Sequence, residues 1–476
     1  MKPLDREILR LALPSILANI TVPLVGMVDL AVAGHLGSLG EAATLIGGVS
    51  VGTMLFDLLY WNFGFLRVGT GGLTAQAYGR EDWQGTRDIL FRGVVLALLI
   101  AALILALQWP FVHLALYVTH GSEAVRELAL RYFFIRIWAA PATLSLMSIK
   151  GWFIGMQDTV SSMAIDLVVN VVNIVSSILL GRWMGFAGIA WGTVIAQYTG
   201  LAFACFLIAR RILFRKEGSS PASISAAEGS GTAQRGRVSC EPETNLPNWK
   251  RFRRVVSGAD LGAFLTMNGN LFIRSLCMVA IYVGFTMISA RYGDLILAIG
   301  AILMKLLLLF SFFTDGFAYA AEALVGKFIG RRDLPAVKMT VRHVFVWSMG
   351  IGMFFVLFYL FGSYPAFRVM TSDPLVADAA RPFYFWLLLM PPIGCAAFTW
   401  DGIFVGATAS RALRNSLLWA LLSFFGLWYF GYAVRGFSLL PEDALHLLLA
   451  AYFAHLLVRT LYLSYRYKKT RSLIAE

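Results

Sequence analysis

One acidic residue inside an apolar segment is the clearest chemical feature of this sequence. Asp29 lies in the stretch PLVGMVDLAVAG, and no lysine or arginine occurs within two helical turns of it along the chain. Apolar surroundings favour the neutral, protonated form of a carboxyl, which suits a group that takes up a proton on one side of a membrane and releases it on the other. We therefore predict that Asp29 carries a proton. The alternative is a hydrogen-bonded acid that only supports the structure.

Two prolines lie in the same apolar segment. Pro14 and Pro23 are both expected inside a helix, where Pro23 removes the backbone hydrogen bond to the carbonyl of Asn19. A helix weakened in this way can bend when its acid changes charge. The two prolines are thus predicted to allow bending of the helix that carries Asp29.

Polar residues follow helical spacing in a later apolar segment. They are Ser162, Asp166, Asn170, Asn173 and Ser177. Their intervals of four, four, three and four residues place them on one stripe of a helix, and Thr193 and Gln197 repeat the interval of four in the next segment. We predict a polar cavity lined by these side chains, with Asp29 facing it. Hydrogen bonding between helices is the alternative, and Asp166 is expected to be a relay step or a structural acid.

The second half of the chain has its own charges in apolar segments, namely Arg274, Lys305, Asp315 and Glu322. Charges at such positions need partners, so we expect ion pairs that fix helix packing. Asp315, Glu322 or an acid on another helix is expected to pair with Lys305. A role in releasing or excluding a substrate is the alternative. Further along, Pro391 and Pro392 are expected to break a helix.

The composition identifies the elements that position these residues. The chain has 476 residues, of which 58% are hydrophobic and 14% are charged, and its mean hydropathy is +0.71. A soluble core cannot hide so much apolar surface. Continuous apolar runs such as VVLALLIAALILAL exclude a β-barrel and predict an all-α integral membrane protein.

Twelve membrane-spanning helices are predicted from these runs. They lie near residues 8–33, 42–67, 89–109, 127–150, 162–181, 188–209, 258–287, 295–325, 340–362, 380–400, 415–434 and 443–463. Residues 213–256, between the sixth and seventh helices, are polar and rich in serine, glycine and glutamate, which predicts a flexible linker.

The basic residues indicate how the chain is oriented. Lysine and arginine number 40, against 27 aspartate and glutamate residues. About 28 of the basic residues fall on the side of the two termini and about five on the opposite side. This asymmetry predicts that the termini and the linker are cytoplasmic in a plasma (inner) membrane. The positive charge then reflects topology, and no nucleic-acid partner is expected.

An internal repeat divides the chain. GWFIGMQDT from Gly151 aligns with GIFVGATAS from Gly402, and AYGRED ending at Asp82 aligns with FIGRRD ending at Asp333, with the same offset of 251 residues. Each half has six predicted helices, so both copies enter the membrane in the same orientation and enclose a substrate path. We predict an N-terminal lobe of residues 1–212, the linker 213–256, and a C-terminal lobe of residues 257–476.

Several motifs together resemble a known family. LRVGTGGLTAQAYGRED, DGFAYAAEALVGKFIGRRD, GMQDT, and NVVNIV followed by GFAGIAWGTVIAQ are similar to the multidrug and toxic compound extrusion (MATE) transporters, and most similar to their DinF branch. The resemblance implies two pseudo-symmetric six-helix lobes, an outward-facing cleft and a monomer. It also implies antiport of bulky organic cations, or of amphipathic drugs, against protons or sodium.

The resemblance also carries residue roles. In the family a first-helix acid fifteen residues after a proline performs the coupling, and Pro14 and Asp29 match that pair. A second acid often follows four residues after the asparagine that corresponds to Asn173, but Ser177 stands there. A two-carboxylate site suited to sodium is therefore not expected, which favours a proton gradient as the energy source, with neither cofactor nor metal.

Two other functions remain as alternatives. A flippase or exporter of a lipid-linked or amphipathic metabolite would need several basic residues for a pyrophosphate. The apolar segments contain few, such as Arg67, Arg131, Arg136, Arg274 and Lys305. A membrane-embedded enzyme would need acids or histidines clustered beside a nucleophile or a metal, and the sequence indicates no such cluster and no phosphate-binding loop. The prediction is therefore a non-enzymatic multidrug efflux antiporter that works by alternating access.

Overall fold

The computed structural model describes residues 3–36, 42–118, 123–217, 259–370, 374–436 and 438–470. These residues form α-helices joined by short turns, with three 3₁₀ segments, Asn62–Gly64, Ile137–Ala139 and Arg381–Phe383. The α-helices are α1 Pro3–Leu36, α2 Ala42–Trp61, α3 Phe65–Gly79, α4 Trp83–Val118, α5 Glu123–Arg136, α6 Ala140–Gly155, α7 Thr159–Met184, α8 Phe186–Glu217, α10 Ala259–Ala290, α11 Asp294–Gly330, α12 Leu334–Met370, α13 Pro374–Ala379, α14 Tyr384–Gly406, α15 Ser410–Val434 and α16 Pro441–Thr470.

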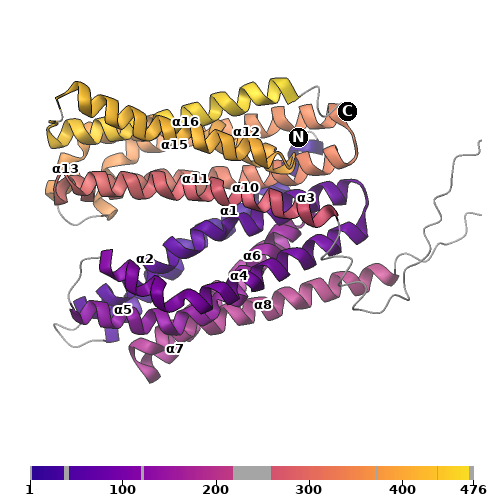
Figure 1. The fold of residues 1–476 in the computed structure, drawn as a ribbon, viewed down its shortest axis with the longest axis horizontal. Coiled ribbons are helices and arrows are strands. Elements are labelled where there is room, and N and C mark those ends of the chain that lie inside the picture. Colours follow the sequence, from indigo (N-terminus) through magenta and orange to yellow (C-terminus); the bar gives the residue numbers. More distant parts are fainter. Residues whose placement is uncertain are drawn as a thin grey trace, which may run out of the picture.

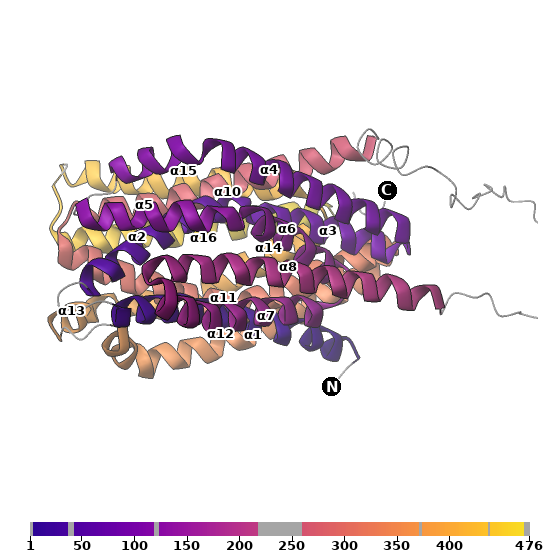
Figure 2. The same ribbon diagram turned by 90° about the horizontal axis from the view of Figure 1, so that it is seen from below.

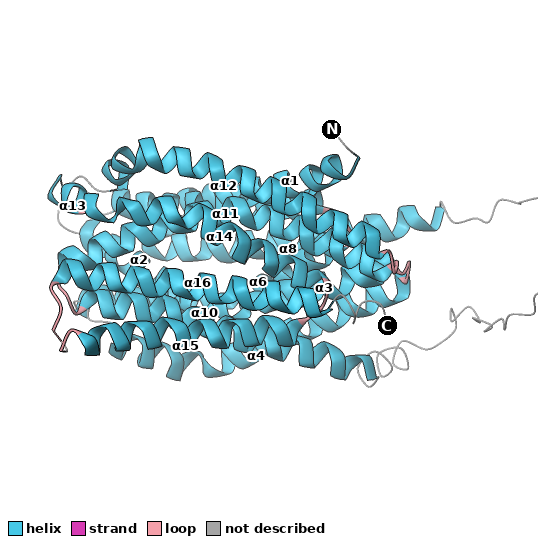
Figure 3. Ribbon diagram, turned by 90° about the horizontal axis from the view of Figure 1, so that it is seen from above, coloured by secondary structure: helices cyan, strands magenta, loops and turns pink. Residues whose placement is uncertain are grey.

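Twelve spans in the described part of the chain are long and apolar enough to cross a membrane, which confirms the predicted all-α membrane fold. The helices α1–α8 form one group and α10–α16 form a second, and the long helices of both run along the same axis (Figure 1). Figures 2 and 3 place the start of α1, the end of α8 and the end of α16 at one end of the bundle. Most of the predicted linker, with Cys240, lies outside the described residues.

The prolines do not interrupt their helices. The α-helix α1 continues past Pro14 and Pro23, and α14 continues past Pro391 and Pro392. The expected break at Pro391 and Pro392 is therefore wrong. Each proline removes only one backbone hydrogen bond, and neighbouring helices in a membrane bundle can compensate for that loss.

The internal repeat is visible in the backbone. Glu81 and Arg332 have φ of 60° and 59°, and Gln157 and Thr408 have φ of 62° and 54°. Both pairs have the 251-residue offset of the sequence repeat, and a left-handed backbone is uncommon for residues other than glycine. The residues that follow Glu81 and Arg332 also make equivalent contacts. The Asp82 carboxylate accepts a hydrogen bond from the Gly85 amide, and the Asp333 carboxylate accepts one from the Ala336 amide. The repeat predicted from sequence is thus a repeat of structure.

Glycines bring the two groups of helices together where α3 meets α11. A Cβ on Gly79 would meet the Lys327 carbonyl and the Cα of Gly330, and a Cβ on Gly330 would meet the Cα of Gly79. These two glycines are repeat equivalents, so the pseudo-two-fold axis passes between them. Small residues permit such close approach of helices in membranes.

Two glutamine side chains link the two groups of helices at the same end of the bundle. The Gln76 side chain donates to the Gly406 carbonyl at 3.0 Å, and the Gln157 side chain donates to the Ala323 carbonyl at 2.7 Å. Each hydrogen bond joins one group of helices to the other. This end of the molecule is therefore closed by backbone packing and by hydrogen bonds between the two halves.

We predict that Gly79→Ala destabilises the protein by about 1–3 kcal/mol, because the new methyl group has no space beside α11. Gly350→Ala is the matched control, since a Cβ there meets nothing within 4 Å. Thermal unfolding of both purified variants in detergent measures the difference. Equal melting temperatures for the two variants would contradict the close crossing.

Candidate functional site

Asp29 lies on α1, where that helix packs against α7. Its side chain is buried, with 5% of the residue exposed. The Ser177 hydroxyl donates a hydrogen bond to the Asp29 carboxylate at 2.9 Å. Ser177 is the residue that stands where the family often has a second acid, so the structure places a neutral hydroxyl beside the predicted proton carrier.

A cation from a distant part of the sequence lies near this acid. Arg136, the last residue of α5, acts electrostatically on Asp29, although no ion pair within 4 Å joins them among the described residues. Its guanidinium donates to the Tyr132 hydroxyl at 3.0 Å and lies 4.8 Å from the centre of the Phe56 ring. The sequence around Asp29 contains no cation, so only the packing of α5 reveals this neighbour.

A further acid on α2 was missed by the sequence analysis. Asp57 is exposed, and both Arg136 and Lys305 act on it electrostatically. Lys305 belongs to α11, in the other half of the molecule. An acid within the apolar run MLFDLLYW is the same kind of signal that identified Asp29, so Asp57 was detectable in principle.

The polar stripe of α7 is connected to two neighbouring helices. The Asn170 amide donates to the Thr21 hydroxyl of α1 at 2.6 Å, and the Asn173 amide donates to the Thr193 hydroxyl of α8 at 3.0 Å. Asn173 and Ser177 are buried. These hydrogen bonds join helices, as the alternative for the stripe expects. The Asn173 Oδ1 is buried and has no hydrogen-bond partner among the described residues. Gln197 is half-buried.

Asp166, at the other end of the stripe, has its own partner. The Lys150 ammonium of α6 lies 2.8 Å from the Asp166 carboxylate, and each side chain is about one quarter exposed. Asp166 lines a cavity of about 80 Å³ together with residues of α1, α3, α6, α7 and α11. The predicted cavity of the first, fifth and sixth spans differs from this one, because α8 and Asp29 are not among its lining residues.

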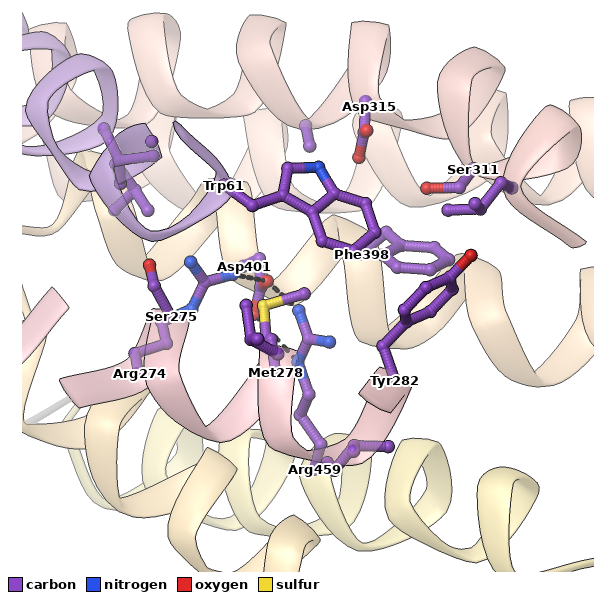
Figure 4. A pocket seen from close by; sticks show the side chains of 18 of the residues that line it. Trp61, Arg274, Ser275, Met278, Tyr282, Ser311, Asp315, Phe398, Asp401 and Arg459 are labelled. Carbon is purple, nitrogen blue, oxygen red and sulfur yellow. Dashed lines mark hydrogen bonds and ion pairs between the residues drawn. The ribbon is translucent and has the colours of Figure 1, made fainter. Parts of the chain in front are cut away.

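A larger cavity of about 310 Å³ lies mainly in the second half of the molecule. Residues of α10, α11, α14 and α16 line it, together with Trp61, Gly64, Arg67 and Val68 of the first half. Three of the predicted charged residues, Arg274, Asp315 and Glu322, are among its lining residues. Figure 4 shows Asp315 on one side of this cavity and Arg274 on the other.

Two ion-pair groups contain the charged residues of this cavity other than Asp315. Arg67 lies 3.4 Å from the Glu322 carboxylate and 4.1 Å from the centre of the Tyr319 ring, which joins α3 to α11. The second group is a carboxylate, Asp401, paired with both Arg274 and Arg459. Asp401 was missed because the predicted tenth span ended one residue before it. Arg459 was missed although it is a charge within the predicted twelfth span, residues 443–463.

Lys305 is paired with neither Asp315 nor Glu322, and the acid on another helix on which it acts electrostatically is Asp57 of α2. Lys305 is exposed, and Glu322 is paired with Arg67 instead. Lys305 and Asp315 are ten residues apart on one helix, which separates them by about 15 Å along its axis. In the described part of the chain no group of three or more His, Cys, Asp or Glu residues could hold a metal ion.

Comparisons of the sequence with known proteins show which family the chain is similar to. The model of the MatE family matches residues 14–179 and 271–431. The chain is 35% identical to DNA damage-inducible protein F of Escherichia coli, over 88% of this chain and 84% of that protein. It is 23% identical to a probable multidrug resistance protein NorM of Photorhabdus laumondii, over 92% of this chain and 88% of that protein.

Solved structures agree on the fold. A crystal structure of MATE in the bent conformation superimposes with a TM-score of 0.78 at 17% identity, covering 100% of this chain and 98% of that one. At this identity the likeness concerns the fold alone. Together with the family model and the 35% identical relative, it shows that this multi-pass membrane protein belongs to the MATE family of multidrug efflux transporters.

Proposed function

We propose that the protein is a secondary active antiporter that exports organic, lipophilic cations in exchange for protons. The observation that carries the proposal is the buried carboxylate of Asp29, which is hydrogen-bonded to the Ser177 hydroxyl and has no fixed ion pair among the described residues. An acid with a hydroxyl as its partner can lose or gain a proton without leaving a buried cation unpaired. Asp29 is then the proton carrier, and transport needs neither a cofactor nor a metal.

The packing of the two halves supports alternating access. The tight crossing of Gly79 and Gly330 closes one end of the molecule, and that end holds the start of α1 and the end of α16. In the orientation favoured by the basic residues it faces the cytoplasm of a cell with the protein in its plasma (inner) membrane. Release of a substrate to the outside then requires no break in this contact, whereas uptake from the cytoplasm requires one. The chain acts as a monomer in this proposal.

The cavity charges favour drug export over transport of a lipid-linked pyrophosphate. A pyrophosphate would need several arginines without competing acids. Here Arg67 faces Glu322, and Arg274 and Arg459 share Asp401. The flippase is therefore the second candidate.

Replacement of the proton carrier is expected to abolish coupling. In proteoliposomes with an imposed pH gradient, Asp29→Asn loses gradient-driven efflux of a fluorescent organic cation, because an amide cannot release a proton. Asp378→Asn, a change of an exposed acid paired with Arg381, is the matched control and retains efflux. Undiminished efflux by a well-folded Asp29→Asn protein would refute the assignment.

A sodium gradient at equal pH is expected to drive no efflux. Hard cations take about six oxygen ligands, and the described contacts of Asp29 supply only a carboxylate and one hydroxyl. The measurement uses the same proteoliposomes and dye, with sodium chloride replaced by choline chloride on one side. Efflux that follows the sodium gradient would replace the proton with sodium as the coupling ion.

Asp166 is expected to be structural and not a proton relay. The ion pair predicts that Asp166→Asn lowers stability by leaving Lys150 unpaired, and that the double variant Lys150→Gln with Asp166→Asn recovers it. Proton-driven efflux by the double variant should match the parent protein. A folded double variant with no coupled efflux would instead make Asp166 a relay.

A further inference from the structure

The cavity of about 310 Å³ has a positive side, formed by Arg274, Arg459 and Asp401. Both guanidiniums contact the single Asp401 carboxylate, which leaves this group with one positive charge in excess. The two arginines differ in exposure, since 12% of the Arg274 side chain is accessible and only 1% of that of Arg459. A bound molecule can therefore contact Arg274, whereas Arg459 is almost inaccessible and is paired with the Asp401 carboxylate.

The opposite side of the cavity is negative. Asp315 extends into the cavity from α11, on the side opposite Arg274 and Arg459, as Figure 4 shows. It forms no ion pair within 4 Å in the described part of the chain, although Arg67, Arg274 and Arg459 act on it from a distance. Arg67 is already engaged by Glu322. Asp315 is thus a carboxyl available to a cationic group.

Aromatic side chains lie between the two charged sides. Trp61 and Tyr282 are in edge contact with ring centres 5.0 Å apart, and they come from the two different halves of the molecule. Phe398 lies near them, with the Arg459 guanidinium 5.7 Å from its ring centre. Such rings suit a flat apolar body and stabilise a cation placed over their faces.

Burial of an unmatched charge is costly, so the charges of a bound molecule must complement those of the cavity. We propose that this cavity binds zwitterionic aromatic amphipaths, with the anionic group at Arg274, the cationic group at Asp315, and the flat body against Trp61 and Phe398. A molecule with both charges keeps the cavity neutral, whereas a simple cation leaves the excess charge of the arginine group unmatched. The site goes beyond the proposed export of cations, and it can be tested by binding without transport.

Two dyes that differ in one group test the proposal. Unalkylated rhodamine has a free carboxylate beside its xanthylium cation, and its methyl ester is the same molecule without the anion. Fluorescence anisotropy with purified full-length protein near neutral pH measures both affinities. The parent protein should bind the free acid more tightly than the ester. Arg274→Gln should weaken binding of the acid about tenfold or more and that of the ester less than about twofold.

Companion variants separate recognition from folding. Arg274→Lys keeps the charge and should retain most of the preference for the free acid, and Asp315→Asn should weaken both dyes because both have the cationic group. Arg291→Gln removes an exposed arginine that follows α10 and should change neither affinity. Equal binding of the two dyes by the parent protein, or equal losses for both dyes in Arg274→Gln, would overturn the proposal. Failure of proton-driven efflux alone would affect only the proposed transport function.

Discussion

The close crossing of α3 and α11 is the constraint on which the rest of the structure depends. Gly79 and Gly330 allow the two backbones to touch, and the equivalent glycines of α6 and α14 extend the contact. A Cβ on Gly151 would meet the Arg67 carbonyl, and one on Gly402 would meet the Ala318 carbonyl, its repeat equivalent. Four helices therefore share one closely packed centre, and this centre determines which side chains of the two halves face each other.

The interface between the halves follows from that centre. Because α3 and α11 cross closely, Arg67 of one half reaches Glu322 and Tyr319 of the other. Arg67 and Tyr319 line both the larger and the smaller cavity, so they form part of the wall between them. Because Arg67 and Glu322 belong to different halves, a change in the relative position of the halves would alter the distance between them.

Charges in the membrane interior divide into two kinds. Most are in fixed ion pairs, such as Lys150 with Asp166 and the two arginines with Asp401, and these pairs hold helices together. Asp29 and Asp315 are different, since each has a serine hydroxyl as its polar neighbour and arginines only at a distance. An acid without a fixed cation can exchange a proton or a ligand at lower cost than one in an ion pair. Among the described residues, Asp29 lies in the first half and Asp315 in the second, and Asp57 of α2 is a further acid with no ion pair within 4 Å.

The sequence by itself determined the membrane fold, the number of helices, the repeat and the identity of Asp29 as an unusual acid. Apolar runs of sufficient length must cross the membrane as helices, and a 251-residue offset between turn motifs requires two similar halves. Partners of individual charges were decided only by tertiary structure. Arg136 approaches Asp29 from a helix more than 100 residues away, and Glu322 pairs with Arg67 from the other half. The physical reason is that a charge in an apolar helix requires compensation, but helix packing selects which group supplies it.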